Sequence, residues 1–293
     1  MNVLTQILGG TLVATALWDL FHTLAHPSGH GALSSRLLAL AWRLSKRLGR
    51  SARRLAGPAG VLMVIGTWGL LVVVGAALVY LPHLPESFSY GAGLDPPSRN
   101  MLVDALYLSL VTVATLGFGD IVPTAPWLRL LIPLQALIGF TLLTGAVTWT
   151  LQIYPALTRR RVLSLRLAAL AKAHTAERLD QLSECTAARL LENLAAGLTE
   201  VRMDLTQYTE TYYFREVTPE GSLARTIGYA AELAAAGQRS SREDVRLAAD
   251  VLEHTLVGLA HVLDAQFLHT GRETTDVLSV YTADHAESAR GRG

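Results

Sequence analysis

Three long apolar segments constrain what this 293-residue chain can fold into. They run from Val3 to Leu24, from Val61 to Leu81 and from Pro126 to Leu151. Each is long enough to cross the hydrocarbon core of a bilayer, which takes about 20 helical residues. Of all residues 51% are hydrophobic and only 17% are charged, a balance too apolar for a soluble protein of this size. Because a spanning backbone must satisfy its own hydrogen bonds, we predict an all-α membrane protein.

The first apolar segment has a competing interpretation as a cleaved signal peptide. No basic residue precedes it, and Asp19 stands where small residues would lead to a cleavage site. We therefore predict a retained N-terminal transmembrane helix over residues 1–26. Near its end Asp19, His22 and His26 share one helical face. This face fits either a proton- or metal-responsive cluster or a set of polar residues at the membrane interface.

The stretch 27–57 is basic and contains no acidic residue. By the positive-inside rule it stays in the cytoplasm, and its leucines at helical spacing predict an amphipathic linker along the inner membrane surface. The second span then runs outward and the third runs inward, since three arginines at 159–161 follow it. This orientation predicts a multi-pass protein of the plasma membrane, with the N-terminus outside and the C-terminus in the cytoplasm.

The string Thr115-Leu116-Gly117-Phe118-Gly119-Asp120 lies between the second and third spans. Its position predicts a loop that re-enters the membrane. A dehydrated monovalent cation needs several oxygen ligands at once, and stacked backbone carbonyls supply them without formal charge. Glycine readily visits left-handed conformations, so Gly117 and Gly119 allow successive carbonyls to turn toward one axis. Thr115 can add a hydroxyl ligand, while Leu116 and Phe118 would point away from the ion and brace the strand from behind.

This string resembles the selectivity filter of potassium channels, whose common form is Thr-Val-Gly-Tyr-Gly-Asp, with Phe a frequent substitute for Tyr. The resemblance covers about Val61 to Leu151. It implies two core membrane helices around a re-entrant pore loop, one filter per chain, and a homotetramer in the lipid bilayer, because a ring of carbonyls requires several copies. It also implies K⁺ as the permeant ion and no other cofactor. The implied ion-binding residues are Thr115, Leu116, Gly117, Phe118 and Gly119, with K⁺ held at the carbonyls of the first four and Asp120 at the outer mouth.

The third span supplies the remaining site residues that the resemblance implies. Potassium channels carry a glycine some 20 residues past the filter, at which the inner helix bends, and Gly139 lies at that position. Glycine also serves close helix packing in membranes, so a gating hinge and a packing role both stay open. The implied lining of the cavity and inner gate is Phe140, Leu143, Val147 and Leu151.

These patterns divide the chain into five parts. We predict the N-terminal helix at 1–26, the basic linker at 27–57, an ion-channel pore domain at 58–157, a cytoplasmic helical domain at 158–270 and a disordered polar tail at 271–293. Within the pore domain we expect an outer helix at 61–81, a pore helix at 101–114, the filter at 115–120 and an inner helix at 126–151.

The region after residue 158 has no membrane-length apolar run. Leucines and other apolar residues recur every three or four positions, which predicts a bundle of packed helices. No glycine-rich nucleotide-binding motif is present, so the ligand or protein partner of this domain stays unidentified. The formal net charge of +1 gives no electrostatic case for nucleic-acid binding.

Together these features predict a potassium-selective channel that conducts K⁺ passively and is gated by a signal that the sequence does not identify. A weakly selective cation channel is the nearest alternative, because Leu116 is bulkier than the usual Val behind the filter. A membrane-anchored sensor or scaffold is the more distant one. No ATP-binding loop or catalytic constellation supports an enzyme.

Overall fold

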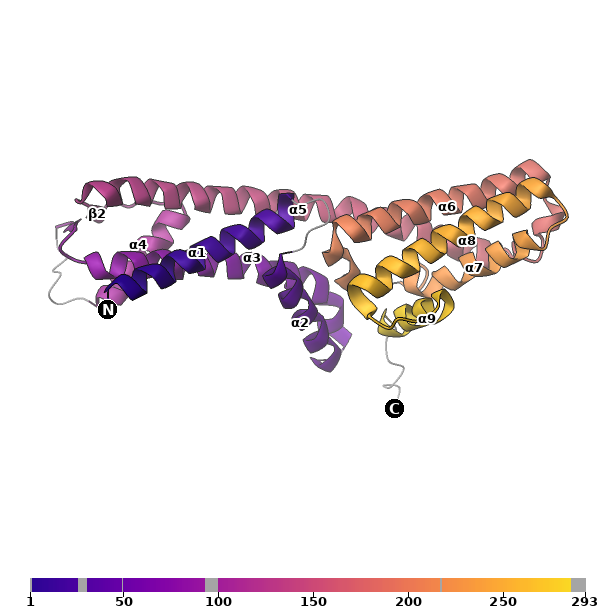
Figure 1. Cartoon of the computed structure of the whole chain (residues 1–293), viewed down its shortest axis with the longest axis horizontal. Coiled ribbons are helices and arrows are strands. Elements are labelled where there is room, and N and C mark those ends of the chain that lie inside the picture. The colour runs from indigo at the N-terminus through magenta and orange to yellow at the C-terminus, as the bar shows by residue number, and fades with distance from the viewer. Residues whose placement is uncertain (1, 26–30, 49, 93–99, 217, 286–293) are drawn as a thin grey trace. The chain divides into compact units, whose positions relative to one another are not determined.

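The computed structural model describes the chain except for residues 1, 26–30, 49, 93–99, 217 and 286–293. The described residues are almost all helical and form two compact units. The first unit comprises residues 1–39 and 59–151, and the second comprises residues 40–58 and 152–293. Figure 1 shows the elements of both.

Long apolar helices build the first unit. The segments Val3–Leu24, Leu55–His83 and Pro126–Lys172 are each long and apolar enough to cross a membrane. The prediction of an all-α membrane protein is thereby confirmed. These segments belong to α1 (Asn2–Ala25), α3 (Arg50–Tyr80) with the short 3₁₀-helix η1 (Leu81–His83), and α5 (Pro126–Lys172).

Two glycines let α1 and α3 cross in close contact. A Cβ added at Gly9 would lie 2.3 Å from the carbonyl oxygen of Gly75, and one added at Gly75 would lie 2.7 Å from that of Gly9. No side chain fits at either position, so the two backbones pack directly, as small residues allow in membrane helices. Ala16 is also fully buried along α1. The N-terminal helix is therefore packed into the first unit along its length.

A short apolar helix and two short strands complete the first unit. The helix is α4 (Met101–Val113), whose N-terminus is capped by the Asn100 side chain, which accepts a hydrogen bond from the Leu102 backbone N at 3.0 Å. Strand β1 (Phe88–Tyr90) pairs antiparallel with β2 (Ile121–Pro123). The strands therefore join the segment before α4 to the segment that follows the loop at 115–120.

The second unit is a helical bundle. Helix α8 packs along α6 and α7, and α9 packs on α7 and α8 (Figure 1). The core consists mainly of leucine and alanine side chains from these helices, which confirms the helical character predicted from their spacing. The elements are α2 (Ala32–Leu48, from residue 40), α6 (Glu184–Gln207), α7 (Leu223–Gln238), α8 (Glu243–Leu263), α9 (Thr274–His285), the 3₁₀-helices η3 (Leu179–Gln181) and η4 (Thr209–Tyr213), and the π-helix η5 (Asp264–Leu268).

Several boundaries differ from the sequence predictions. Helix α5 continues to Lys172 instead of ending near 151, α3 begins at Arg50 instead of 61, and residues 40–57 of the expected linker belong to the second unit. The prediction of a disordered tail from residue 271 is wrong for Thr274–His285, which form α9. This polar segment forms a helix because it buries Val277 and Tyr281 against other helices. Residues 286–293 of that tail lie outside the described part of the chain.

Candidate ion-conducting site

The backbone of residues 115–119 alternates in handedness. Thr115, Gly117 and Gly119 have φ angles of 57°, 55° and 77°, while the residues between them are not left-handed. In an ordinary extended strand successive carbonyls point to opposite sides; this alternation turns them toward the same side. Glycine adopts such angles freely, whereas a left-handed threonine costs about 1–2 kcal/mol. Strain of this kind at a non-glycine residue is typical of functional sites.

The carbonyl oxygens of residues 115–119 are available as ligands. Within the part of the chain that the structure describes, no hydrogen bond is donated to them. The amides behave differently, because the N–H groups of Leu116 and Gly117 both donate to the carbonyl of Val111, at 2.8 and 3.4 Å. The loop therefore binds to the end of α4 through its donors and leaves its acceptors free. The C-terminal end of a helix carries partial negative charge, which favours a cation nearby.

A buried polar network holds α4 between its neighbours. The Tyr80 hydroxyl donates to Oε1 of Gln135 at 2.5 Å, and Nε2 of Gln135 donates to the Ser109 hydroxyl oxygen at 2.7 Å. Ser109 in turn donates to the carbonyl of Val73 at 2.7 Å. Each of these three side chains has a hydrogen-bond partner, so the network fixes α3, α4 and α5 against one another without leaving one of them unpaired. Sequence reasoning missed it, although a glutamine inside an apolar span is a detectable signal.

The Asp120 carboxylate is held in place at the end of the loop. One oxygen accepts a hydrogen bond from the Tyr107 hydroxyl at 2.6 Å, and the other accepts from the backbone N of Ile121 at 3.2 Å. The carbonyl of Asp120 accepts from the backbone N of Gly91 at 2.7 Å. The residue predicted at the outer mouth thus links α4, the loop and the segment after β1.

Gly139 lies where α5 meets the end of α4. A Cβ at this position would lie 2.1 Å from the carbonyl oxygen of Val113 and 2.9 Å from its Cα. A real Cβ cannot approach a backbone so closely, so glycine is required for this contact. The geometry gives Gly139 a packing role, and its role as a hinge stays a prediction.

The other predicted pore residues form exposed surface in the single chain. Leu116 and Phe118 are 57% and 66% exposed, so both side chains lie at the surface of the single chain. That they point away from an ion and brace the strand from behind stays a prediction. On α5 the side chains predicted to line the cavity and gate are exposed as well, namely Phe140, Leu143, Val147 and Leu151.

The polar face at the end of α1 has a structural partner. Asp19 is buried and accepts hydrogen bonds from the backbone N of Leu33 and Ser34, from the Ser34 hydroxyl and, at 2.9 Å, from Nε1 of Trp68. It therefore caps the N-terminus of α2 and anchors it to α3. His22 is half-buried, and its Nδ1 lies 2.9 Å from the carbonyl oxygen of Trp18. His26 lies outside the described residues. Within the part of the chain that the structure describes, no group of three or more His, Cys, Asp or Glu side chains is placed to hold a metal ion.

A polar cluster in the second unit joins α2 to α9. The Asp284 carboxylate accepts hydrogen bonds from Nε1 of Trp42 at 3.0 Å, from the Tyr212 hydroxyl at 2.8 Å and from Lys46. Burial disfavours the charged carboxylate, but the hydrogen bonds outweigh burial and lower the pKa of Asp284. The neighbouring His285 is half-buried, and its removal from water lowers its pKa to about 4. The cluster therefore holds Asp284 charged and His285 neutral near pH 7.

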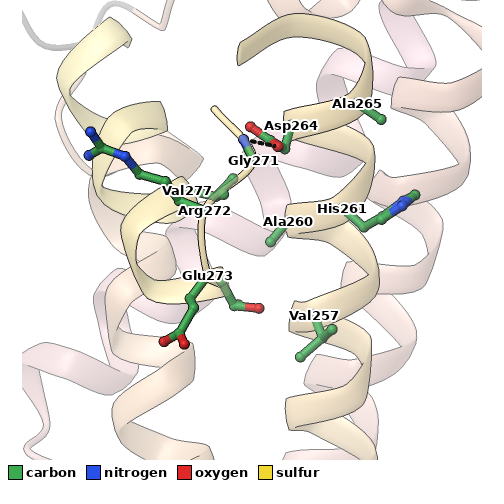
Figure 2. Close-up of a pocket in the computed structure, with 10 residues that line it drawn as sticks. Val257, Ala260, His261, Asp264, Ala265, Gly271, Arg272, Glu273 and Val277 are labelled. Carbon is green, nitrogen blue, oxygen red and sulfur yellow. Dashed lines mark hydrogen bonds between the residues drawn. The ribbon is translucent and has the colours of Figure 1, made fainter. Parts of the chain in front are cut away.

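A pocket of about 300 Å³ lies between α8 and the loop before α9 (Figure 2). The Asp264 carboxylate beside it is already engaged by Thr270 and by the backbone N of Gly271, and the hydrogen bonds from Thr270 lower its pKa. Figure 2 shows the charged ends of Arg272 and Glu273 directed away from α8. Helix α8 lines the pocket with Val257, Ala260 and His261, and a cytoplasmic ligand stays a prediction.

Comparison with known proteins agrees with this geometry. A family model described as "Ion channel" matches residues 67–154, which contain the C-terminal part of α3, all of α4, the loop and most of α5. The two pore potassium channel c of Oryza sativa subsp. japonica is 35% identical over 88 residues, covering 29% of this chain and 18% of the relative. The two-pore potassium channel 5 of Arabidopsis thaliana is 41% identical over 56 residues, covering 18% of this chain and 14% of the relative.

A bacterial protein matches a longer part of the chain. The uncharacterized membrane protein YdjJ of Bacillus subtilis (strain 168) is 28% identical over 163 residues, covering 53% of this chain and 46% of the relative. The chain thus spans less than a fifth of the plant channels and under half of the bacterial protein. No solved structure matches the chain with comparable significance.

The spans, the loop with its free carbonyls and the matched segment define an all-α membrane protein of the ion-channel class. Residues 67–154 thus match an ion-channel family model, and the similarity to two plant potassium channels supports a place in the potassium-channel superfamily.

Proposed function

We propose that this protein is a potassium-selective channel that conducts K⁺ passively through a pore formed by four copies of the chain. The observation that carries the proposal is the alternating handedness at Thr115, Gly117 and Gly119, which turns a row of unbonded carbonyls to one side. The carbonyls of residues 115–118 are the proposed ligands for dehydrated K⁺. Passive conduction of this kind needs no catalytic group.

The exposed apolar residues support an assembly of copies. A single chain supplies only one strand of carbonyls, whereas a dehydrated cation needs ligands from several directions. Leu116 and Phe118 are exposed in one chain, and neighbouring copies would cover them. The exposed stripe Phe140, Leu143, Val147 and Leu151 on α5 would then line the cavity and the inner gate. We place the N-terminus outside the plasma membrane and the helical unit in the cytoplasm, on the basis of the basic residues that flank the spans.

An unselective cation channel is the second candidate. Leu116 supports it, because a side chain bulkier than the usual Val behind the filter would loosen the discrimination between K⁺ and Na⁺. The two candidates share the pore and differ in the ratio of the two fluxes.

The test is ion flux from proteoliposomes that contain the purified full-length chain. We expect K⁺ flux well above Na⁺ flux, and its loss in Gly117→Ala, because a Cβ strains the left-handed backbone at φ 55°. Gly66→Ala is the control, since Gly66 lies in the membrane-length helix α3, where alanine is compatible with the backbone and a Cβ meets nothing within 4 Å. Equal K⁺ and Na⁺ fluxes would favour the unselective channel. No flux from the unmodified chain, or full flux from Gly117→Ala, would contradict the proposal.

A further inference from the structure

Helix α2 presents one exposed face that combines leucine and arginine. Leu40, Leu44 and Leu48 recur every fourth residue and are 46%, 44% and 72% exposed. Arg43 and Arg47 are exposed on the adjacent row of the same helix. Apolar side chains flanked by arginines on one side of a helix are typical of helices that lie at a membrane surface.

The opposite face of α2 is engaged and sets the orientation of the exposed one. Trp42 is buried in the core of the second unit, its indole donates to Asp284, and the Arg215 guanidinium lies 4.3 Å from its ring centroid. Lys46 pairs with the same carboxylate, 238 residues away along the chain. Since these contacts fix the rotation of the helix, the leucine face cannot turn inward to bury itself.

Charge determines what can cover this face. From residue 20 to residue 85 the sequence has no acidic residue, so α2 and its flanks are purely basic. A basic surface rejects a basic partner and attracts an anionic one. The chain enters α2 from the apolar span of α1 and leaves it into that of α3, so sequence alone keeps this helix within reach of a bilayer.

We infer that the face formed by Leu40, Arg43, Leu44, Arg47 and Leu48 binds the anionic phospholipid surface of the membrane. The leucines enter the boundary between headgroups and acyl chains, and the arginines pair with lipid phosphates. The other side of the helix holds α9 through Asp284, so this helix joins the lipid surface to the helical unit. The inference depends on α1 and α3 spanning the membrane and not on which ion the pore conducts.

The test places a fluorophore on the proposed face of the full-length chain. Cys185, the single cysteine, is exposed and is first removed by Cys185→Ser. Leu44→Cys is then labelled with NBD, and the protein is placed in nanodiscs of phosphatidylcholine alone or of phosphatidylcholine with phosphatidylglycerol at 3:1, each containing acyl-brominated lipid as a quencher. We expect strong quenching with phosphatidylglycerol and less without it. The same label on the native Cys185 reports whether quenching is specific to α2.

A charge variant and salt separate lipid binding from structural damage. Arg43→Gln with Arg47→Gln should weaken docking about 25-fold, from a factor of about five for each arginine at an anionic surface. The matched control is Arg189→Gln with Arg239→Gln, which removes the same charge from exposed positions of α6 and the end of α7. High salt should reproduce the effect in the unmodified chain. Equal quenching in both lipid compositions, or no quenching in either because protein covers the face, would overturn the inference. Because ion flux is not measured, this outcome is independent of the pore.

Discussion

Replacing Gly139 by alanine tests whether this glycine serves packing or bending. The added Cβ would lie 2.1 Å from the carbonyl oxygen of Val113, while carbon and oxygen in contact are normally about 3.3–3.6 Å apart. The end of α4 or the helix α5 would therefore have to move by about 1 Å. Both neighbouring groups are backbone, so no side-chain rotation relieves the clash. The loop at residues 115–119 follows α4 directly, which makes the proposed ion-binding carbonyls the nearest structure to be displaced.

The expected energy follows from two opposing effects. Overpacking a close contact costs about 1–3 kcal/mol, and a clash with backbone belongs at the upper end of that range. Alanine recovers about 1 kcal/mol of helix propensity relative to glycine. The net loss at Gly139 is therefore about 2 kcal/mol, whereas Gly66→Ala, with open space around its Cβ, gains about 1 kcal/mol.

The assay is thermal unfolding of the purified protein in detergent, together with ion flux. A difference of about 3 kcal/mol between the two variants corresponds to melting temperatures about 6–12 °C apart. We also expect Gly139→Ala to lose flux because the loop is displaced. If both variants melt together and Gly139→Ala conducts with an altered open probability, the packing argument is refuted and the hinge is favoured.

Two further predictions concern the side chains of Asp19 and His285. Asp19→Asn turns one acceptor of the α2 cap into a donor that faces the N–H groups of Ser34 and Trp68, and should cost about 1–3 kcal/mol in thermal unfolding; an equal loss in His22→Ala, one turn further along α1, would contradict this. The neutral His285, whose pKa burial lowers to about 4, contributes stability that is complete above the unfolded pKa of about 6.5 and declines as the pH falls toward 4. We expect about 2 kcal/mol to be lost between pH 7.5 and pH 5, and His285→Gln to abolish that part of the pH dependence; an unchanged pH profile in the variant would show that other groups cause it.

Some features of this protein follow from local sequence. The three spans depend only on the length of an apolar run, since a helix of about 20 apolar residues satisfies its own backbone wherever it lies. The loop at 115–120 is equally local, because left-handed backbone at alternate positions calls for glycine at Gly117 and Gly119. Each predicted span lies within a long apolar helix of the structure, and the second and third of these helices extend beyond the predicted ends.

Other features depend on contacts between residues that are distant in sequence. The link of Gln135 to Tyr80 and Ser109, and the approach of Gly139 to Val113, require helix positions that no local pattern encodes. Likewise Trp42 finds Asp284 across 242 residues, and this pairing brings a segment between two spans into the helical unit.

The same distinction explains the two clearest surprises. The sequence around Asp19 does not indicate that this residue caps α2. That role arises because a buried carboxylate needs hydrogen-bond donors, and only the fold brings those donors to it. Helix α9 has a polar sequence and a weak helical pattern, and it is stabilised by burying Val277 and Tyr281 against other helices. Sequence alone determined the spans and the loop at 115–120, because hydrophobic length and backbone freedom are properties of short segments. Tertiary structure decided the packing glycine, the buried polar pairs and the last helix, because their energies exist only once distant segments meet.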